Sequence, residues 1–76
     1  MWIKTHAGSL VNADKLLSIE IADCKTGFQV WGYTANGDTG FILGQYPTKK
    51  EAEQAEAEIC IKMNHETIMR MPEYKW

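Results

Sequence analysis

The sequence contains four side chains of the types that hold structural zinc: His6, Cys24, Cys60 and His65. Such sites are normally built from close pairs such as C-x-x-C, which place two ligands on one turn. Each of the four comes from a different segment, and no close pair occurs. We therefore expect no metal and no cofactor. Widely spaced cysteines predict two free thiols in a reducing compartment, with a disulfide or a shared metal as the alternative.

The residues that could support catalysis are equally scattered. Nucleophilic catalysis needs a nucleophile, a base and an orienting group, and Cys24 has no such neighbours in the sequence. The segment Gly37-Asp38-Thr39-Gly40 is no phosphate-binding loop, because no Gly-Lys-Ser/Thr follows it. We therefore predict that the protein is not an enzyme and has no catalytic residues, and a small enzyme is the least favoured alternative.

Aromatic and aliphatic side chains are the better candidates for a functional surface. Trp31, Tyr33 and Ile42 fall on one face of a predicted hairpin. Trp and Tyr are enriched in interface hot spots because they bury a large area and keep a polar group. This face is either a partner-binding interface or is covered by the chain's own N-terminal hairpin or C-terminal tail. Further predicted partner-binding residues are Trp2, Ile61, Ile68, Tyr74 and Trp76.

Exposed aromatics could also stack on bases, so nucleotide or single-stranded nucleic-acid binding is the alternative function. It would need basic residues alongside, for which Lys4, Lys15 and Lys25 are candidates. The formal net charge is −2, and the 8 Lys and Arg residues are scattered. Nucleic acid is therefore disfavoured as a partner, because phosphate contacts supply most of its affinity for proteins.

A hairpin must position the aromatic face, and its turn is the clearest local signal. Residues 28–35 and 38–45 flank Asn36-Gly37, the preferred pair for a two-residue type I′ turn. That turn sets Gly32 opposite Phe41, Trp31 opposite Ile42 and Val30 opposite Leu43. One face then carries Phe28, Val30, Phe41 and Leu43, and the other carries Trp31, Tyr33 and Ile42.

Three shorter strands are predicted before the hairpin and one helix after it. Alternating β-forming residues indicate strands at 1–5 and 9–12, and a third in which Leu17, Ile19 and Ile21 face the core. Thr48 and Glu51 have the spacing of a reciprocal capping box at a helix start. We expect Ala52, Ala55, Ile59 and Met63 on the buried helix face, and Ala57, Ile61 and Ile68 on a second apolar stripe.

These elements predict one α+β domain over residues 1–76. Its expected form is an antiparallel sheet of four to five strands with one C-terminal helix packed on one face. Strands and hairpins occupy 1–46, the helix 48–64 with an extension to 71 left open, and the tail 72–76. No apolar run approaches the roughly 20 residues of a membrane span, and no leader pattern is present. We expect a cytoplasmic protein with no membrane partner.

Two segments resemble a group of small uncharacterised proteins of bacteria and their phages. They are Met1-Trp2-Ile3-Lys4-Thr5 with Gly8-Ser9-Leu10-Val11-Asn12, and Leu43-Gly44-Gln45-Tyr46-Pro47-Thr48 with Glu51-Ala52 and Ala55. The resemblance covers about the first sixty residues and rests on structural motifs. It implies a β-sheet with one C-terminal helix and a prophage-type origin, which would place the protein in the cytoplasm of the host cell.

The expected function is therefore non-catalytic protein binding. Small acidic phage proteins often block a host protein, including defence systems, so the resemblance implies an inhibitor that helps a phage to evade host defence. Apolar residues on both faces of a small sheet also favour self-association. The partner is expected to be a host protein or a second copy of the chain, with a dimer as the first expectation for a homo-oligomer.

Overall fold

The computed structural model describes residues 1–34, 40–63 and 68–73. They form six strands, one α-helix and a short 3-10 helix. The strands are β1 (Trp2–Lys4), β2 (Leu10–Asn12), β3 (Leu16–Cys24), β4 (Gly27–Thr34), β5 (Gly40–Tyr46) and β6 (Ile68–Arg70). The helices are η1 (Ala13–Lys15) and α1 (Lys49–Lys62). The α+β class predicted from the sequence is confirmed.

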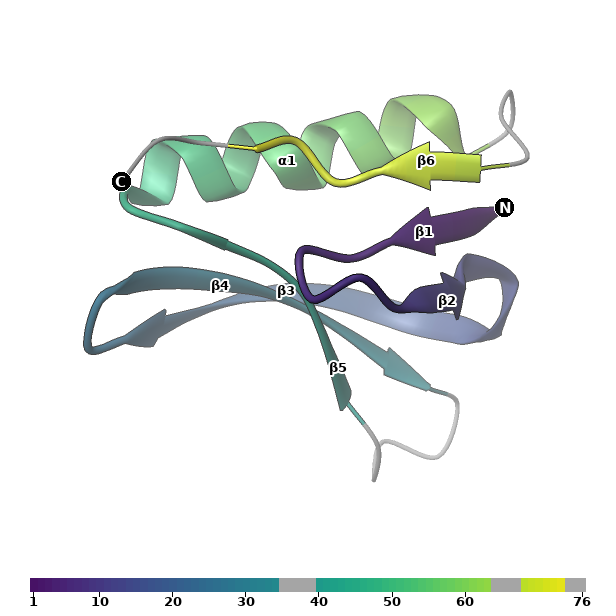
Figure 1. Cartoon of the computed structure of the whole chain (residues 1–76), viewed down its shortest axis with the longest axis horizontal. Helices are drawn as coiled ribbons and strands as arrows, with labels where there is room; N and C mark the ends of the chain where they lie inside the picture. The colour runs from purple at the N-terminus through teal and green to yellow at the C-terminus, as the bar shows by residue number, and fades with distance from the viewer. Residues whose placement is uncertain (35–39, 64–67, 74–76) are drawn as a thin grey trace.

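The strands form two three-stranded sheets, so the expected single sheet of four to five strands is wrong. Sheet A has the order β2-β1-β6, and sheet B has the order β3-β4-β5 (Figure 1). Sheet B is antiparallel throughout, whereas β1 pairs parallel with β6. The N-terminal hairpin takes its third strand from the C-terminal segment. Among the described residues, one backbone hydrogen bond joins the segment after β1 to β5, from the His6 N–H to the Leu43 carbonyl at 3.0 Å.

The helix is shorter than the sequence analysis predicted. It ends at Lys62, and residues 68–70 form β6, so the extension to residue 71 is wrong. Ile68 therefore belongs to sheet A and is not part of a second helical stripe. Pairing with β1 fixes this segment, because the Met71 N–H donates to the Lys4 carbonyl at 3.0 Å. The sequence from 64 to 67, with His65, lies outside the described residues.

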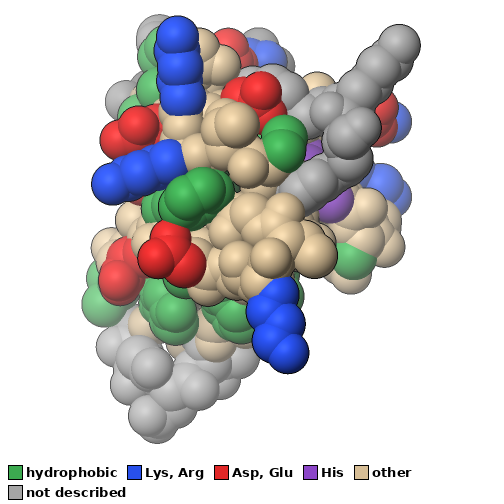
Figure 2. Space-filling view, turned by 90° about the vertical axis from the view of Figure 1, so that its left-hand side faces the viewer, with side chains coloured by type: hydrophobic (Ala, Val, Ile, Leu, Met, Phe, Trp, Pro, Cys, Tyr) green, Lys and Arg blue, Asp and Glu red, His purple; other side chains and the backbone are tan. Residues whose placement is uncertain are grey.

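The described surface carries mixed charge. Figure 2 shows one end of the molecule, where basic and acidic side chains are interspersed with apolar ones. This end of the protein therefore presents no continuous track of positive or of negative charge.

No helix among the described residues is long and apolar enough to cross a membrane.

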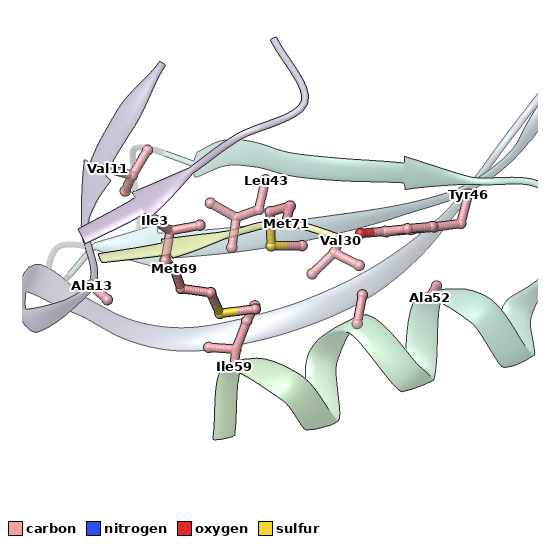
Figure 3. Close-up of a cluster of buried hydrophobic side chains, with 11 residues drawn as sticks. Ile3, Val11, Ala13, Val30, Leu43, Tyr46, Ala52, Ile59, Met69 and Met71 are labelled. Atoms are coloured by element: carbon pink, nitrogen blue, oxygen red, sulfur yellow. The ribbon is translucent and has the colours of Figure 1, made fainter. Parts of the chain in front are cut away.

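One core lies between the two sheets and α1. Sheet A contributes Ile3, Val11 and Met69, and sheet B contributes Val30, Leu43 and Tyr46 (Figure 3). The helix contributes Ala52, Ala55 and Ile59, and Met71 and Ala13 complete the set. The predicted burial of the two alanines and Ile59 is confirmed. Met63, expected on the same helix face, is 42% exposed.

The register of the long hairpin is confirmed for two of the three pairs. Gly32 pairs with Phe41 and Trp31 with Ile42, but Val30 pairs with Gly44 and not with Leu43. A register shift between Val30 and Trp31 leaves Leu43 as the extra residue of a β-bulge. The Asn36-Gly37 turn lies outside the described residues.

A second register shift lies in β3 and moves Leu17 to the surface. The shift falls between Leu16 and Ser18, and Leu17 is 73% exposed, so its expected position in the core is wrong. Leu16 packs against the core in its place. A Cβ on Gly32 would stand 2.8 Å from Leu16 Cδ1, so glycine makes room for this leucine.

The start of α1 carries half of the predicted capping box. Thr48 is the N-cap, and its hydroxyl accepts a hydrogen bond from the Glu51 N–H at 3.2 Å. The reciprocal bond from the Glu51 carboxylate is absent, and Glu51 Oε2 is buried without a hydrogen-bond partner among the described residues. The threonine hydroxyl is therefore the part of the capping box that satisfies a backbone amide of the first turn.

Replacing Thr48 with alanine should lower the free energy of unfolding by about 1 kcal/mol, because one amide of the first turn loses its acceptor. Thr48→Ser keeps the hydroxyl and should stay close to the native protein. Urea denaturation followed by circular dichroism measures both variants. Equal losses in the two variants would contradict the capping role.

Candidate functional site

The two aromatic side chains of β4 form a stacked pair on the outer face of sheet B. The rings of Trp31 and Tyr33 have centroids 6.0 Å apart and planes 14° from parallel. Tyr33 pairs with Gly40, and Trp31 pairs with Ile42, so all four residues share one face. We call Trp31, Tyr33, Gly40 and Ile42 the aromatic patch. The predicted placement of Trp31, Tyr33 and Ile42 on one face is confirmed.

Gly40 lies directly beneath the rings of Trp31 and Tyr33 in the aromatic patch. A Cβ at this position would stand 2.8 Å from Tyr33 Cε1 and 2.9 Å from Trp31 Cε3. Real Cβ atoms do not approach other heavy atoms so closely, so any larger residue would push the rings away from the sheet. Glycine thus permits both rings to lie against the strand, which holds them in a fixed position at low entropic cost.

The helix leaves the aromatic patch uncovered. It packs on the opposite face of sheet B, where Val30 and Leu43 enter the core. Ile42 is 43% exposed, and both aromatic rings are half-buried. The indole Nε1–H donates to Gln29 Oε1 at 3.0 Å, so its polar group is already satisfied.

The N-terminal hairpin reaches only one edge of the aromatic patch. A groove of about 350 Å³ lies there, between the turn that follows β1 and the start of β5. Ala7 and Ser9 line one side of this groove, and Trp31 and Ile42 line the other. The hairpin therefore borders the patch without burying it. The tail residues Tyr74 and Trp76 lie outside the described residues.

The other predicted partner-binding residues lie away from this patch. Trp2 and Ile68 are register partners on the outer face of sheet A, where they are 46% and 60% exposed. Ile61 is 66% exposed on α1 and lines a shallow pocket with Ala57 and Pro72. Leu10, which was not among the predicted partner-binding residues, is 54% exposed on sheet A, where it pairs with Lys4. Leu10 and Val11 are consecutive residues of a strand and must face opposite sides, so the sequence could have predicted that one of the two is exposed.

His6 uses both ring nitrogens to connect three segments. The Gln45 N–H donates to Nδ1 at 3.0 Å, and Nε2 lies 2.6 Å from the Pro72 carbonyl oxygen. Because Nδ1 accepts, the proton sits on Nε2, which donates to Pro72. The Tyr46 hydroxyl donates to the same carbonyl at 2.9 Å. His6, which could bind zinc by residue type alone, is thus part of a structural contact between β5 and the C-terminal segment.

Both cysteines are free thiols. Among the described residues, no three His, Cys, Asp or Glu side chains gather as a metal site would require. Cys24 lies at the end of β3, where Gln45 Nε2 donates to its Sγ at 3.6 Å. Partial desolvation raises the pKa of the Cys24 thiol. Hydrogen bonds from Gln45, Thr26 and Gly27 outweigh this effect and hold the pKa below its usual value.

Removing the Gln45 side chain should slow alkylation of Cys24 near neutral pH. A thiolate is the nucleophile, and Gln45→Ala deletes a donor that stabilises it, so the pKa of Cys24 should rise. The rate of iodoacetamide labelling against pH, measured in a Cys60→Ser background, should shift to higher pH. Gln29→Ala, a glutamine with no bond to Cys24, is the control. If the pH profile of Cys24 labelling does not shift in Gln45→Ala, the side-chain amide of Gln45 is not what lowers the pKa of Cys24.

Comparisons with protein families, curated proteins and solved structures find no match to this chain. The fold and the surfaces described above are therefore the basis for a functional proposal.

Proposed function

We propose that this protein is a non-catalytic protein-binding module and that the aromatic patch is its binding surface. The observation that carries the proposal is the stacked Trp31–Tyr33 pair, held against Gly40 on the face of sheet B opposite α1. Rigid aromatic side chains provide contact area without much loss of side-chain entropy. They are the residue types that dominate binding energy at interfaces.

The surroundings of the patch suit a protein partner. On β3, Glu20 pairs with Trp31 and Ser18 pairs with Tyr33, so polar side chains border the rings. Gln29 lies on the other side of the indole. An apolar centre with a polar rim is the usual anatomy of a protein interface. Ile42 extends the apolar centre on β5.

A second copy of the chain is the first partner to test. Such a dimer would bury the same patch on both subunits, as two-fold interfaces do. The resemblance noted in the sequence adds a host protein, bound and blocked by a phage product, as the other partner class. Both partners would use the same aromatic centre, so one set of variants tests both.

Light scattering of the pure protein over a concentration series tests self-association. Ile42→Arg places a charge in the aromatic patch, and Ile68→Arg is the matched control on sheet A. We expect the native chain and Ile68→Arg to form a dimer, and Ile42→Arg to remain near 8.7 kDa.

If the native chain also remains near 8.7 kDa, the partner must be a different protein. Quantitative capture from bacterial lysate with all three proteins then decides the matter. A protein captured in defined stoichiometry by the native chain and Ile68→Arg, but lost with Ile42→Arg, supports the proposal. Identical capture by all three would overturn it.

A further inference from the structure

The carboxyl ends of β1 and β6 form a second candidate site, separate from the aromatic patch, although Thr5 lines both this pocket and the groove at the edge of the patch. The two strands are parallel, so their ends lie at the same edge of sheet A (Figure 1). A pocket of about 370 Å³ opens there, lined among others by Lys4, Arg70, Thr5 and Glu73. The pocket is open to solvent, and Trp2 lies outside its lining residues, on the other side of Lys4 along β1.

Two cations with no ion-pair partner among the described residues stand side by side in this pocket. Lys4 and Arg70 are register partners on neighbouring strands, so both project from the same face of sheet A. Like charges placed directly opposite each other in a sheet are destabilising. The structure contains ion pairs between Met1 and Asp14 and between Lys62 and Glu58, but none from Lys4 or Arg70 to a described residue. A bound anion would offset this repulsion.

The rest of the pocket leaves its net charge positive. Glu73 is a single carboxylate among the lining residues, and it lies beyond ion-pair distance of both cations. His6 also lines the pocket, but both of its ring nitrogens are already engaged, with the Gln45 N–H and the Pro72 carbonyl. The arginine guanidinium presents several donors in a fork that matches carboxylate and phosphate. Two cations balance a phosphate monoester, with its charge of about −1.5 to −2, better than a singly charged carboxylate, so phosphate is the anion that this pair suits best.

An aromatic ring lies on the same face, next to the cations. Trp2 precedes Lys4 by two residues on β1, so the two side chains point to the same side, about 7 Å apart along the strand. Trp2 is 46% exposed, and its register partner Ile68 is also exposed, as is Leu10, the β2 partner of Lys4. A flat ligand that carries a phosphate could stack on the indole while its phosphate meets Lys4 and Arg70.

We infer that this site binds a mononucleotide, with the phosphate between Lys4 and Arg70 and the base on Trp2. Stacking on an aromatic ring and charge-assisted hydrogen bonds from arginine recognise these two parts. A long polyanion fits less well. The chain has a net charge of −2, and the end of the molecule in Figure 2 shows no continuous basic track. The site is independent of the aromatic patch.

NMR titration of the ¹⁵N-labelled protein with AMP at low salt tests this inference. We expect saturable shifts in the amides of Trp2, Lys4 and Arg70 and in the Trp2 indole. Arg70→Gln and Lys4→Gln should each weaken AMP binding about tenfold, the loss typical of one charged hydrogen bond. Lys15→Gln, a lysine of η1 outside the pocket, should bind as the native chain does.

Three further probes separate the parts of the ligand. Adenosine and inorganic phosphate should each bind more weakly than AMP, because each lacks one of the two contacts. Phosphate equal to AMP would overturn the role of Trp2, and a dT oligonucleotide that binds while AMP does not would overturn the mononucleotide. Unchanged AMP affinity in Arg70→Gln and Lys4→Gln, with native spectra, would overturn the site. None of these outcomes bears on the aromatic patch.

Discussion

Replacing Leu43 with alanine is expected to lower the free energy of unfolding by about 2–5 kcal/mol, the range for deleting a buried leucine side chain. Leu43 is fully buried in the core between sheet B, sheet A and α1 (Figure 3). Truncation would leave a cavity where all three meet. A chain of 76 residues is expected to be stable by only roughly 4–11 kcal/mol. This single change should therefore remove a large part of the total.

The chain offers a matched control in the same residue type. Leu17 is also in a strand of sheet B, but it is 73% exposed. Leu17→Ala should change stability by about 0.5 kcal/mol or less, as surface substitutions usually do. Urea denaturation of both variants, followed by tryptophan fluorescence, measures the difference. If Leu43→Ala and Leu17→Ala lower the free energy of unfolding by the same amount, the bulge at Leu43 and the register shift at Leu17 are both assigned incorrectly.

Local signals predicted the pairing of β4 and β5 but not the two register shifts. The Asn-Gly pair set Gly32 against Phe41 and Trp31 against Ile42, as observed. A bulge adds one residue on one strand, and because Phe41, Ile42 and Leu43 are all apolar, alternation of apolar residues does not show which one is the extra residue. Gly44, next to Leu43, was the available signal, because glycine inside a strand often marks a bulge.

Sheet A could be predicted only in part. The N-terminal hairpin was expected from alternation, and it forms as β1 and β2. Its third strand comes from the far end of the chain, and a three-residue strand carries too little periodicity to distinguish it from helix. Burial does alternate, since Met69 and Met71 are buried while Ile68 and Arg70 are exposed, but Ile68 is apolar and hides this pattern in the sequence. Residues 68–70 form a strand because they pair with β1, and not because of their local sequence preference.

The candidate sites show the same division between local and long-range information. The aromatic patch lies within one hairpin, so sequence spacing was enough to bring Trp31, Tyr33 and Ile42 together. Trp2 and Ile68 meet only because β6 pairs with β1, and so do Lys4 and Arg70. Residues at opposite ends of the chain could not be placed side by side without that pairing.

Replacing Trp31 with alanine should weaken partner binding by about 2 kcal/mol or more, the loss typical of an interface hot spot. This corresponds to a dissociation constant about 30-fold higher. The indole is half-buried within the monomer and stacks on Tyr33, so some folding stability should also be lost. Stacked aromatic pairs contribute about 0.5–1.5 kcal/mol beyond their buried area. The loss in binding should therefore exceed the loss in folding.

Two measurements on each variant separate these effects. Sedimentation over a concentration series gives the dissociation constant, and urea denaturation below that concentration gives the stability of the monomer. Gln29→Ala is the matched control, because it removes only the acceptor of the indole Nε1–H and keeps the ring in place. It should bind nearly as well as the native chain, since the ring supplies most of the contact area. If Trp31→Ala instead unfolds the protein and no interface exists to lose, Trp31 is a core residue, and the partner must contact another face.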